Sequence, residues 1–130
     1  MVVALIALGL GLIVATAVVT AARFGDLPES IPVHFGIDGR ADSYGPRLII
    51  WLPVALQCVE AATSLLLYAF GASVAVSLIT TICVAAILLW LAINWQNAAI
   101  TRSDRLAMGQ FALVAAAIVL AGVAASRIIH

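Results

Sequence analysis

Long apolar stretches alternate with short polar segments along the whole chain. Four stretches, at residues 2–22, 46–69, 72–95 and 106–126, consist almost entirely of apolar residues. Each has about the 20 residues that an α-helix needs to cross the hydrocarbon core of a bilayer. The pattern predicts an all-α membrane protein, a four-transmembrane-helix bundle that forms a single integral membrane domain over residues 1–130. Only residues 70–73 separate the second and third stretches, so we expect a tight antiparallel pair there.

Prolines and polar residues indicate where these helices begin and end. Pro46 precedes the second stretch, and a proline in the first turn of a helix costs no hydrogen bond, so we expect it to open the second helix. The third helix is expected to end near Trp95, before a polar connection at residues 97–105. Ser103 or Asp104 is a suitable N-cap for the fourth helix.

The composition agrees with a membrane location and excludes several other classes of protein. Hydrophobic residues make up 65% of the chain and charged residues only 9%, whereas soluble domains have about 25% charged residues. The formal net charge is zero and lysine is absent, which argues against nucleic acid as a partner. Cys58 and Cys83 both lie inside predicted membrane spans, where they indicate neither a disulfide framework nor a zinc site.

The arginines give a prediction for the orientation of the helices. An even number of spans places both termini on one side of the membrane and the two longer loops on the other. Five arginines lie in or beside these loops, and the side of the termini has only Arg127. The positive-inside rule therefore predicts a multi-pass protein of the cell membrane with cytoplasmic loops. So few charges also leave dual insertion open.

The segment at residues 23–47 is the largest polar part of the chain, and it has the pattern of an ordered loop. It contains seven of the twelve charged side chains and three of the four prolines. Pro28 and Pro32 favour extended backbone around residues 31–35, which would place Ile31, Val33 and Phe35 on one face and His34 on the other. Asp38-Gly39 is a turn signal before a second extended piece at residues 40–44. We therefore expect an ordered extended and turn loop that caps the bundle.

This segment resembles a known family. The residues that carry the resemblance are Leu27, Pro28, Ile31, Pro32, His34, Phe35, Gly39, Asp42, Tyr44, Gly45 and Arg47. In this spacing they are similar to the small membrane domain of unknown function found at the N-terminus of SdpI-type immunity proteins. The resemblance implies a bacterial or archaeal cell-membrane protein. It also implies a role in immunity to a membrane-active toxic peptide, or in signalling through a captured regulatory protein.

Glu60 is the candidate for chemistry inside the membrane. A charge near the middle of a membrane helix is costly and marks a functional site by default. Gln57, Glu60 and Ser64 share one helix face, and a similar stripe is formed by Thr16, Thr20 and Arg23. Asn94 and Asn97 make a third polar pair. These stripes are expected to line a small cavity beneath the loop, although a neutral Glu60 that only holds helices together explains the same pattern.

Metal binding and hydrolysis are two further hypotheses for the loop. His34, Asp38 and Asp42 are ordinary ligands for a divalent metal, but no accepted metal spacing is present, and turn and capping roles explain the same residues. As a hydrolase, the loop would use His34 as base, Asp38 or Asp42 to orient it, and Ser43 or Ser30 as nucleophile. Arg23, Arg40 and Arg47 are expected to pair with loop carboxylates, with lipid phosphate as the alternative.

The leading interpretation is a non-enzymatic binding or sensing module without a cofactor, whose loop recognises a hydrophobic peptide or a regulatory protein beside the lipid. The alternative is a small ion-coupled transporter that uses Glu60. Small residues such as Gly9, Gly11 and Gly122 permit close helix packing, either within one chain or in a homo-oligomer. The predicted ligand-binding residues are His34, Phe35, Asp38, Arg40, Asp42, Tyr44, Arg47, Glu60 and Asn94.

Overall fold

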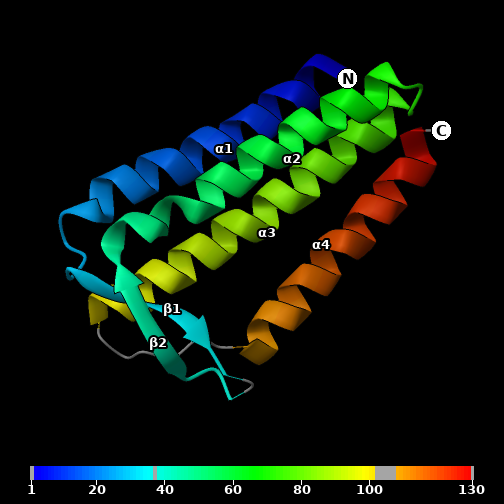
Figure 1. Ribbon diagram of the computed structural model, residues 1–130. Helices are drawn as coiled ribbons and strands as arrows, with labels where there is room; N and C mark the ends of the chain where they lie inside the picture. Colours follow the sequence, from blue (N-terminus) through cyan, green and yellow to red (C-terminus); the bar gives the residue numbers. More distant parts are fainter. Residues whose placement is uncertain (1, 37, 102–107, 130) are drawn as a thin grey trace.

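The computed structural model describes residues 2–36, 38–101 and 108–129 (Figure 1). Its elements are α1 (Val2–Phe24), β1 (Ser30–Phe35), β2 (Ala41–Pro46), the 3-10 helix η1 (Arg47–Trp51), α2 (Leu52–Ala69), α3 (Val74–Thr101) and α4 (Met108–Ile129). Helix α3 contacts each of the other three helices. The two strands lie at one end of the bundle, and both chain termini lie at the opposite end.

Three helical segments are long and apolar enough to cross a membrane. They are Val2–Phe24, Arg47–Ala69, which joins η1 to α2, and Val74–Thr101. Helix α4 contains a shorter apolar stretch at Ala112–Ala124. Large apolar side chains such as Leu8, Val18 and Leu65 are exposed on the outside of the helices, as lipid-facing residues are. A mainly helical fold with three helices suited to cross a membrane is therefore confirmed, and a fourth crossing by α4 stays a prediction.

The predicted start of the second helix is confirmed to within a residue, and the predicted end of the third is wrong. The second helical segment begins at Arg47, directly after Pro46, which ends β2 with extended backbone at φ −66° and ψ 146° and caps the 3-10 helix η1. The proline in the first turn of α2 is Pro53. The third helix continues past Trp95 to Thr101. Its last turns are stabilised by hydrogen bonds from Trp95 to Pro32 of β1 and from Arg23 of α1 to Asn97, which the polar sequence after Trp95 does not reveal. The predicted caps Ser103 and Asp104 lie outside the described residues.

The turn between α2 and α3 confirms the predicted tight antiparallel pair. Gly71 has a left-handed φ of 100° immediately after the helix. Its N–H donates to the Tyr68 carbonyl at 3.0 Å, and the Ala72 N–H donates to the Leu67 carbonyl at 3.0 Å. These two bonds satisfy the last carbonyls of α2, which is the usual role of a glycine after a helix.

The loop between α1 and α2 has the two extended pieces and the turn that were predicted, and in the structure these pieces pair as a two-stranded antiparallel hairpin. Strand β1 pairs with β2 from Ser30 opposite Pro46 to Phe35 opposite Ala41, with irregular register on both sides of His34. At the tip, Gly39 has a left-handed φ of 82°, and the Asp38 carboxylate accepts from the Arg40 N–H at 3.1 Å. Asp38 therefore serves the turn, which was one of the two interpretations of this residue.

The hairpin is attached to the helices through a small apolar cluster. Its buried members are Leu27, Ile31, Ile50, Trp95 and Ala99, with Val33 and Phe35 packed against them. The indole N–H of Trp95 donates to the carbonyl of Pro32 at 2.5 Å. The alternation predicted for β1 is confirmed, because Ile31 is buried while His34 points outward. The hairpin is thus a docked part of the fold.

Helices α3 and α4 approach closely at Gly122. A Cβ atom at this position would lie 2.5 Å from the Cys83 Sγ and 3.3 Å from Ile79 Cγ2. The Cys83 thiol is directed at the Ile118 carbonyl of α4, at 3.7 Å. At Gly122, the small side chain therefore serves packing within one chain. A Cβ at Gly11, in contrast, would meet no atom within 4 Å.

Candidate functional site

His34 and Asp42 form a pair on the outer face of the hairpin. The Nδ1 of His34 lies 2.5 Å from the Oδ1 of Asp42, and because a carboxylate can only accept, the imidazole N–H is the donor. The two side chains are 69% and 54% exposed. Irregular register beside His34 places the pair across the strands, although the Cα partner of His34 is Ser43. The two side chains are thus held together on the outer face, and neither belongs to the apolar cluster that attaches the hairpin to the helices.

The residues proposed as metal ligands are only partly assembled. His34 and Asp42 are in contact, whereas the Asp38 carboxylate is bonded to the turn backbone. Within residues 2–36, 38–101 and 108–129, no three His, Cys, Asp or Glu side chains gather in a way that could hold a metal ion. For the hydrolase hypothesis, His34 is hydrogen-bonded to Asp42, the predicted orienting group, and Ser43 is the Cα partner of His34 on the neighbouring strand.

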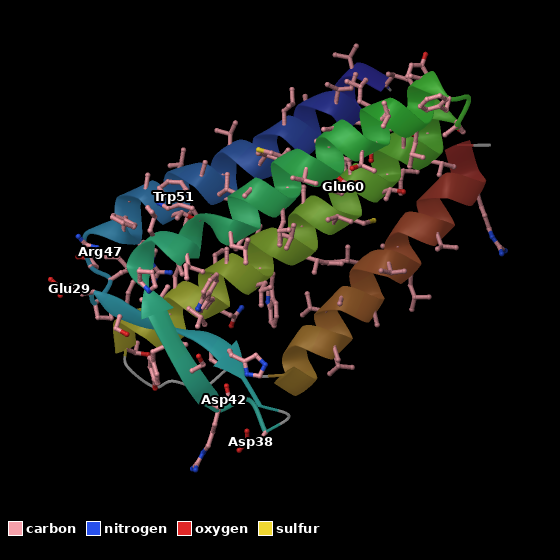
Figure 2. The ribbon with its side chains drawn as sticks, viewed as in Figure 1. Glu29, Asp38, Asp42, Arg47, Trp51 and Glu60 are labelled. Carbon is pink, nitrogen blue, oxygen red and sulfur yellow. The ribbon has the colours of Figure 1, made fainter. Side chains whose placement is uncertain are left out.

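The arginines make contacts that differ from the predicted carboxylate pairing. Arg23 donates to the side-chain oxygen of Asn97 at 2.5 Å, which ties the end of α1 to α3. The guanidinium of Arg47 lies 4.8 Å above the Phe24 ring, and this ring is 6.3 Å from that of Trp51. In the described part of the chain, the salt-bridge geometry found is that of His34 with Asp42. Arg47 and Trp51 lie together at the hairpin end of the helices (Figure 2).

Three other predicted ligand-binding residues occupy different surroundings. Phe35 packs against the apolar cluster, so it belongs to the attachment of the hairpin. Arg40 is exposed beside the turn, and Tyr44 is about half exposed on β2 opposite Pro32. The outer surface therefore combines His34 and Asp42 with Arg40 and Tyr44, while Phe35 faces inward.

A family model for a domain of unknown function, DUF1648, matches residues 11–57. The similarity to this domain is confined to that segment of the chain. This domain comprises most of α1, the whole hairpin, η1 and the first turns of α2. The resemblance seen in the loop residues is thereby confirmed at the level of the domain. No curated protein and no solved structure shows a significant match to the chain.

Glu60 lies just beyond the DUF1648 domain and away from its hairpin. Its Oε1 accepts a hydrogen bond from the Ser64 hydroxyl at 2.7 Å. Gln57 and Ser64 are buried and Glu60 is half-buried, so the predicted stripe faces the bundle interior. Glu60 is about 12 Å further along the bundle axis than Leu52, at roughly 1.5 Å per residue. Figure 2 shows it on α2, well separated from Asp38 and Asp42.

The cavity that was expected beneath the hairpin lies elsewhere in the structure, although Ser64 of the predicted stripe lines it. The apolar cluster around Trp95 occupies the space beneath the hairpin. Asn94 donates to the Trp90 carbonyl of its own helix at 2.8 Å and does not join Glu60. A cavity of about 650 Å³ instead lies between α1, α2 and α3 and is lined by residues at the opposite end of the bundle, among them Val2, Tyr68 and Val74.

Two residues important for the site were missed by the sequence interpretation. Trp95 donates the hydrogen bond that holds β1, but a tryptophan near a helix end indicates only an interfacial position. Gln96 is completely buried in α3 and donates to Thr20 of the DUF1648 domain at 2.8 Å. A glutamine beside the polar pair Asn94 and Asn97, near the end of a mainly apolar helix, was the available signal for this second contact.

Proposed function

We propose that the protein is a non-enzymatic binding module of the cell membrane, in which the DUF1648 hairpin recognises a hydrophobic peptide at the membrane surface. In this proposal α4 is a fourth crossing, so the hairpin lies on one side and both termini lie on the other. The observation that carries the proposal is the exposed pair of His34 and Asp42. The hairpin that carries these two side chains is attached to the helices by the apolar cluster, and the two side chains take no part in that attachment.

The chemistry of the outer face supports a peptide as the ligand. The imidazole and carboxylate offer directional polar contacts, and the exposed ring of Tyr44 supplies apolar area with a polar tip. Arg40, exposed two positions before Asp42 in the chain, adds a positive charge to this segment. An amphipathic peptide lying on the bilayer presents both apolar side chains and backbone polar groups to such a surface. Immunity to a membrane-active toxic peptide is the physiological role that this recognition would serve.

A challenge assay tests the proposal. Cells that express the parent, His34→Ala or Asp42→Ala are exposed to a labelled amphipathic membrane-active peptide, and growth and peptide captured on the purified protein are measured. Glu29→Ala is the matched control, because Glu29 is an exposed acid of the same segment. We expect the parent and Glu29→Ala to protect the cells and retain the peptide, and the two pair variants to lose both. A parent that neither protects nor retains peptide overturns the proposal.

Ion-coupled transport is a second candidate, supported by the bond between Ser64 and Glu60 on the inner face of α2. A carboxyl group on this face is a suitable carrier for a coupled proton or cation. In proteoliposomes, Glu60→Gln should abolish gradient-driven flux while Glu60→Asp retains part of it. Absence of flux in the parent under every gradient applied overturns this candidate and leaves the hairpin proposal intact.

A further inference from the structure

Buried polar contacts join the three helices α1, α2 and α3 in the interior of the bundle. Thr16 and Thr20 lie one turn apart on α1, and both are fully buried. The Nε2 of Gln57 on α2 donates to Thr16 Oγ1 at 2.8 Å and to the Ala85 carbonyl of α3 at 3.0 Å. The Nε2 of Gln96 on α3 donates to Thr20 Oγ1 at 2.8 Å. Two amides therefore lie at successive levels along α1.

The oxygen atom of each of these two side-chain amides has no hydrogen-bond partner. In the described part of the chain, three buried side-chain polar atoms have no hydrogen-bond partner, namely Gln57 Oε1, Gln96 Oε1 and Ser77 Oγ. Gln57 and Gln96 are both 0% exposed. An unsatisfied polar group carries its full desolvation penalty, and hydrocarbon offers no substitute partner. Exchanging the amide atoms of Gln57 does not help, because an oxygen would then face the Ala85 carbonyl.

The three atoms follow one line through the bundle. At the hairpin end, Arg23 bonds Asn97, the neighbour of Gln96 in the sequence. Gln57 comes next, and Glu60 follows one turn later on the same face of α2. Ser64, which bonds Glu60, also lines the cavity of about 650 Å³ between α1, α2 and α3.

The far end of this line has room and a further polar atom. Ser77 lines the same cavity, and its hydroxyl is the third unsatisfied atom. The cavity continues to Val2 and Val74, at the opposite end of the helices from the hairpin. On α3, Ala85 is buried at the level of Gln57, to which its carbonyl is bonded, and the small residue Ala92 is buried between Ala85 and Gln96.

We propose that this interior binds a continuous file of water molecules, which extends from the Arg23–Asn97 contact past Gln96 and Gln57 to Glu60 and the cavity. Water fits because the two amide oxygens can only accept, and one water can donate to each while bonding its neighbours. The file gives Glu60 access to the aqueous side of the hairpin. It is independent of peptide recognition by the hairpin, and it would supply the access that a coupled role for Glu60 requires.

Water-edited solid-state NMR on the full protein in liposomes tests the proposal. Magnetisation transferred from water is followed to the side-chain N–H groups of Gln57 and Gln96, assigned through Gln57→Leu and Gln96→Leu. Asn97, which is exposed, is the wet reference, and the backbone N–H of the outward-facing Leu8 is the dry one. We expect the signals of both glutamine side chains to build up nearly as fast as that of Asn97 and several-fold faster than that of Leu8. Build-up as slow as that of Leu8 overturns the proposal.

The continuity of the file is tested by the same measurement in a variant. Gln96→Leu removes the amide nearest the hairpin side and should lower the transfer to Gln57 several-fold. Unchanged transfer to Gln57 overturns a continuous file that enters from the hairpin side. His34→Ala, on the outer face of the hairpin, is the matched control and should leave both glutamine signals as in the parent. Loss of peptide binding in that control, with hydration intact, separates the two proposals.

Discussion

The hydrogen bond from Trp95 to Pro32 should decide how firmly the hairpin is held. Trp95→Phe keeps an aromatic ring in the apolar cluster but removes the indole N–H. The carbonyl of Pro32 belongs to a residue that is less than 2% exposed, so water cannot replace the lost donor without opening the structure. The substitution therefore tests one polar contact while it preserves most of the packing.

The size of the effect follows from the unsatisfied carbonyl. Leaving a buried acceptor without a donor costs about 1–3 kcal/mol. The packing loss is smaller than the roughly 3–5 kcal/mol typical of Trp→Ala, because most of the ring remains. Since about 1.4 kcal/mol is a tenfold change, the opening equilibrium of the hairpin should rise roughly 5-fold to 150-fold.

Hydrogen exchange of the protein in nanodiscs measures this opening. The reporters are the N–H of Arg47, bonded to the Glu29 carbonyl, and the N–H of Gly36, bonded to the Arg40 carbonyl. Both should exchange faster by the stated factor, while the amides in the middle of α3 keep their rates. Trp51→Phe is the control, since it retains the ring beside Phe24. Unchanged exchange of the hairpin, or an equal acceleration throughout α3, refutes the reasoning.

Three glycine substitutions give further predictions. Gly122→Ala should destabilise the protein by about 1–3 kcal/mol in an unfolding titration, because the new methyl group meets the Cys83 sulfur, and Cys83→Ala should restore much of the loss. Gly45→Ala places a Cβ 3.0 Å from Val33 Cγ1, so hairpin exchange should accelerate, with Val33→Ala as the compensating change. Gly39→Ala should cost about 1–2 kcal/mol because of its left-handed φ, and thermal denaturation should show Gly39→Asn to be milder.

The sequence predicted the elements that depend on local patterns. Apolar length identified the helical spans, and the prolines with Asp38-Gly39 identified two extended pieces, the turn between them and the outward direction of His34. The stripe of Gln57 and Ser64 was also assigned to the correct face of its helix. These features depend on spacing along one element, which the periodicity of a helix or strand fixes directly.

The relation between elements was harder to predict. Thr16 and Gln57 were placed on inward stripes, but their mutual hydrogen bond depends on how far α1 is shifted along α2 and how it is rotated. The same uncertainty in depth led to the expectation of a cavity beneath the hairpin, where the structure has the Trp95 cluster. Pro46 was assigned to a helix because its fixed φ suits both a first helical turn and extended backbone, and only its strand partner Ser30 distinguishes them.

The apolar cluster also determines how the two proposed sites can be separated. Leu27, Ile31 and Trp95 fill the space between the hairpin and the helices, so a ligand at His34 does not touch the bundle interior. The polar contacts of Arg23 with Asn97 and of Thr20 with Gln96 instead follow the interface between α1 and α3. Substitutions on the outer face of the hairpin and substitutions at Glu60 therefore act through different contacts. Sites that share no partner usually contribute independently, so a loss at one of them identifies the activity that it carries.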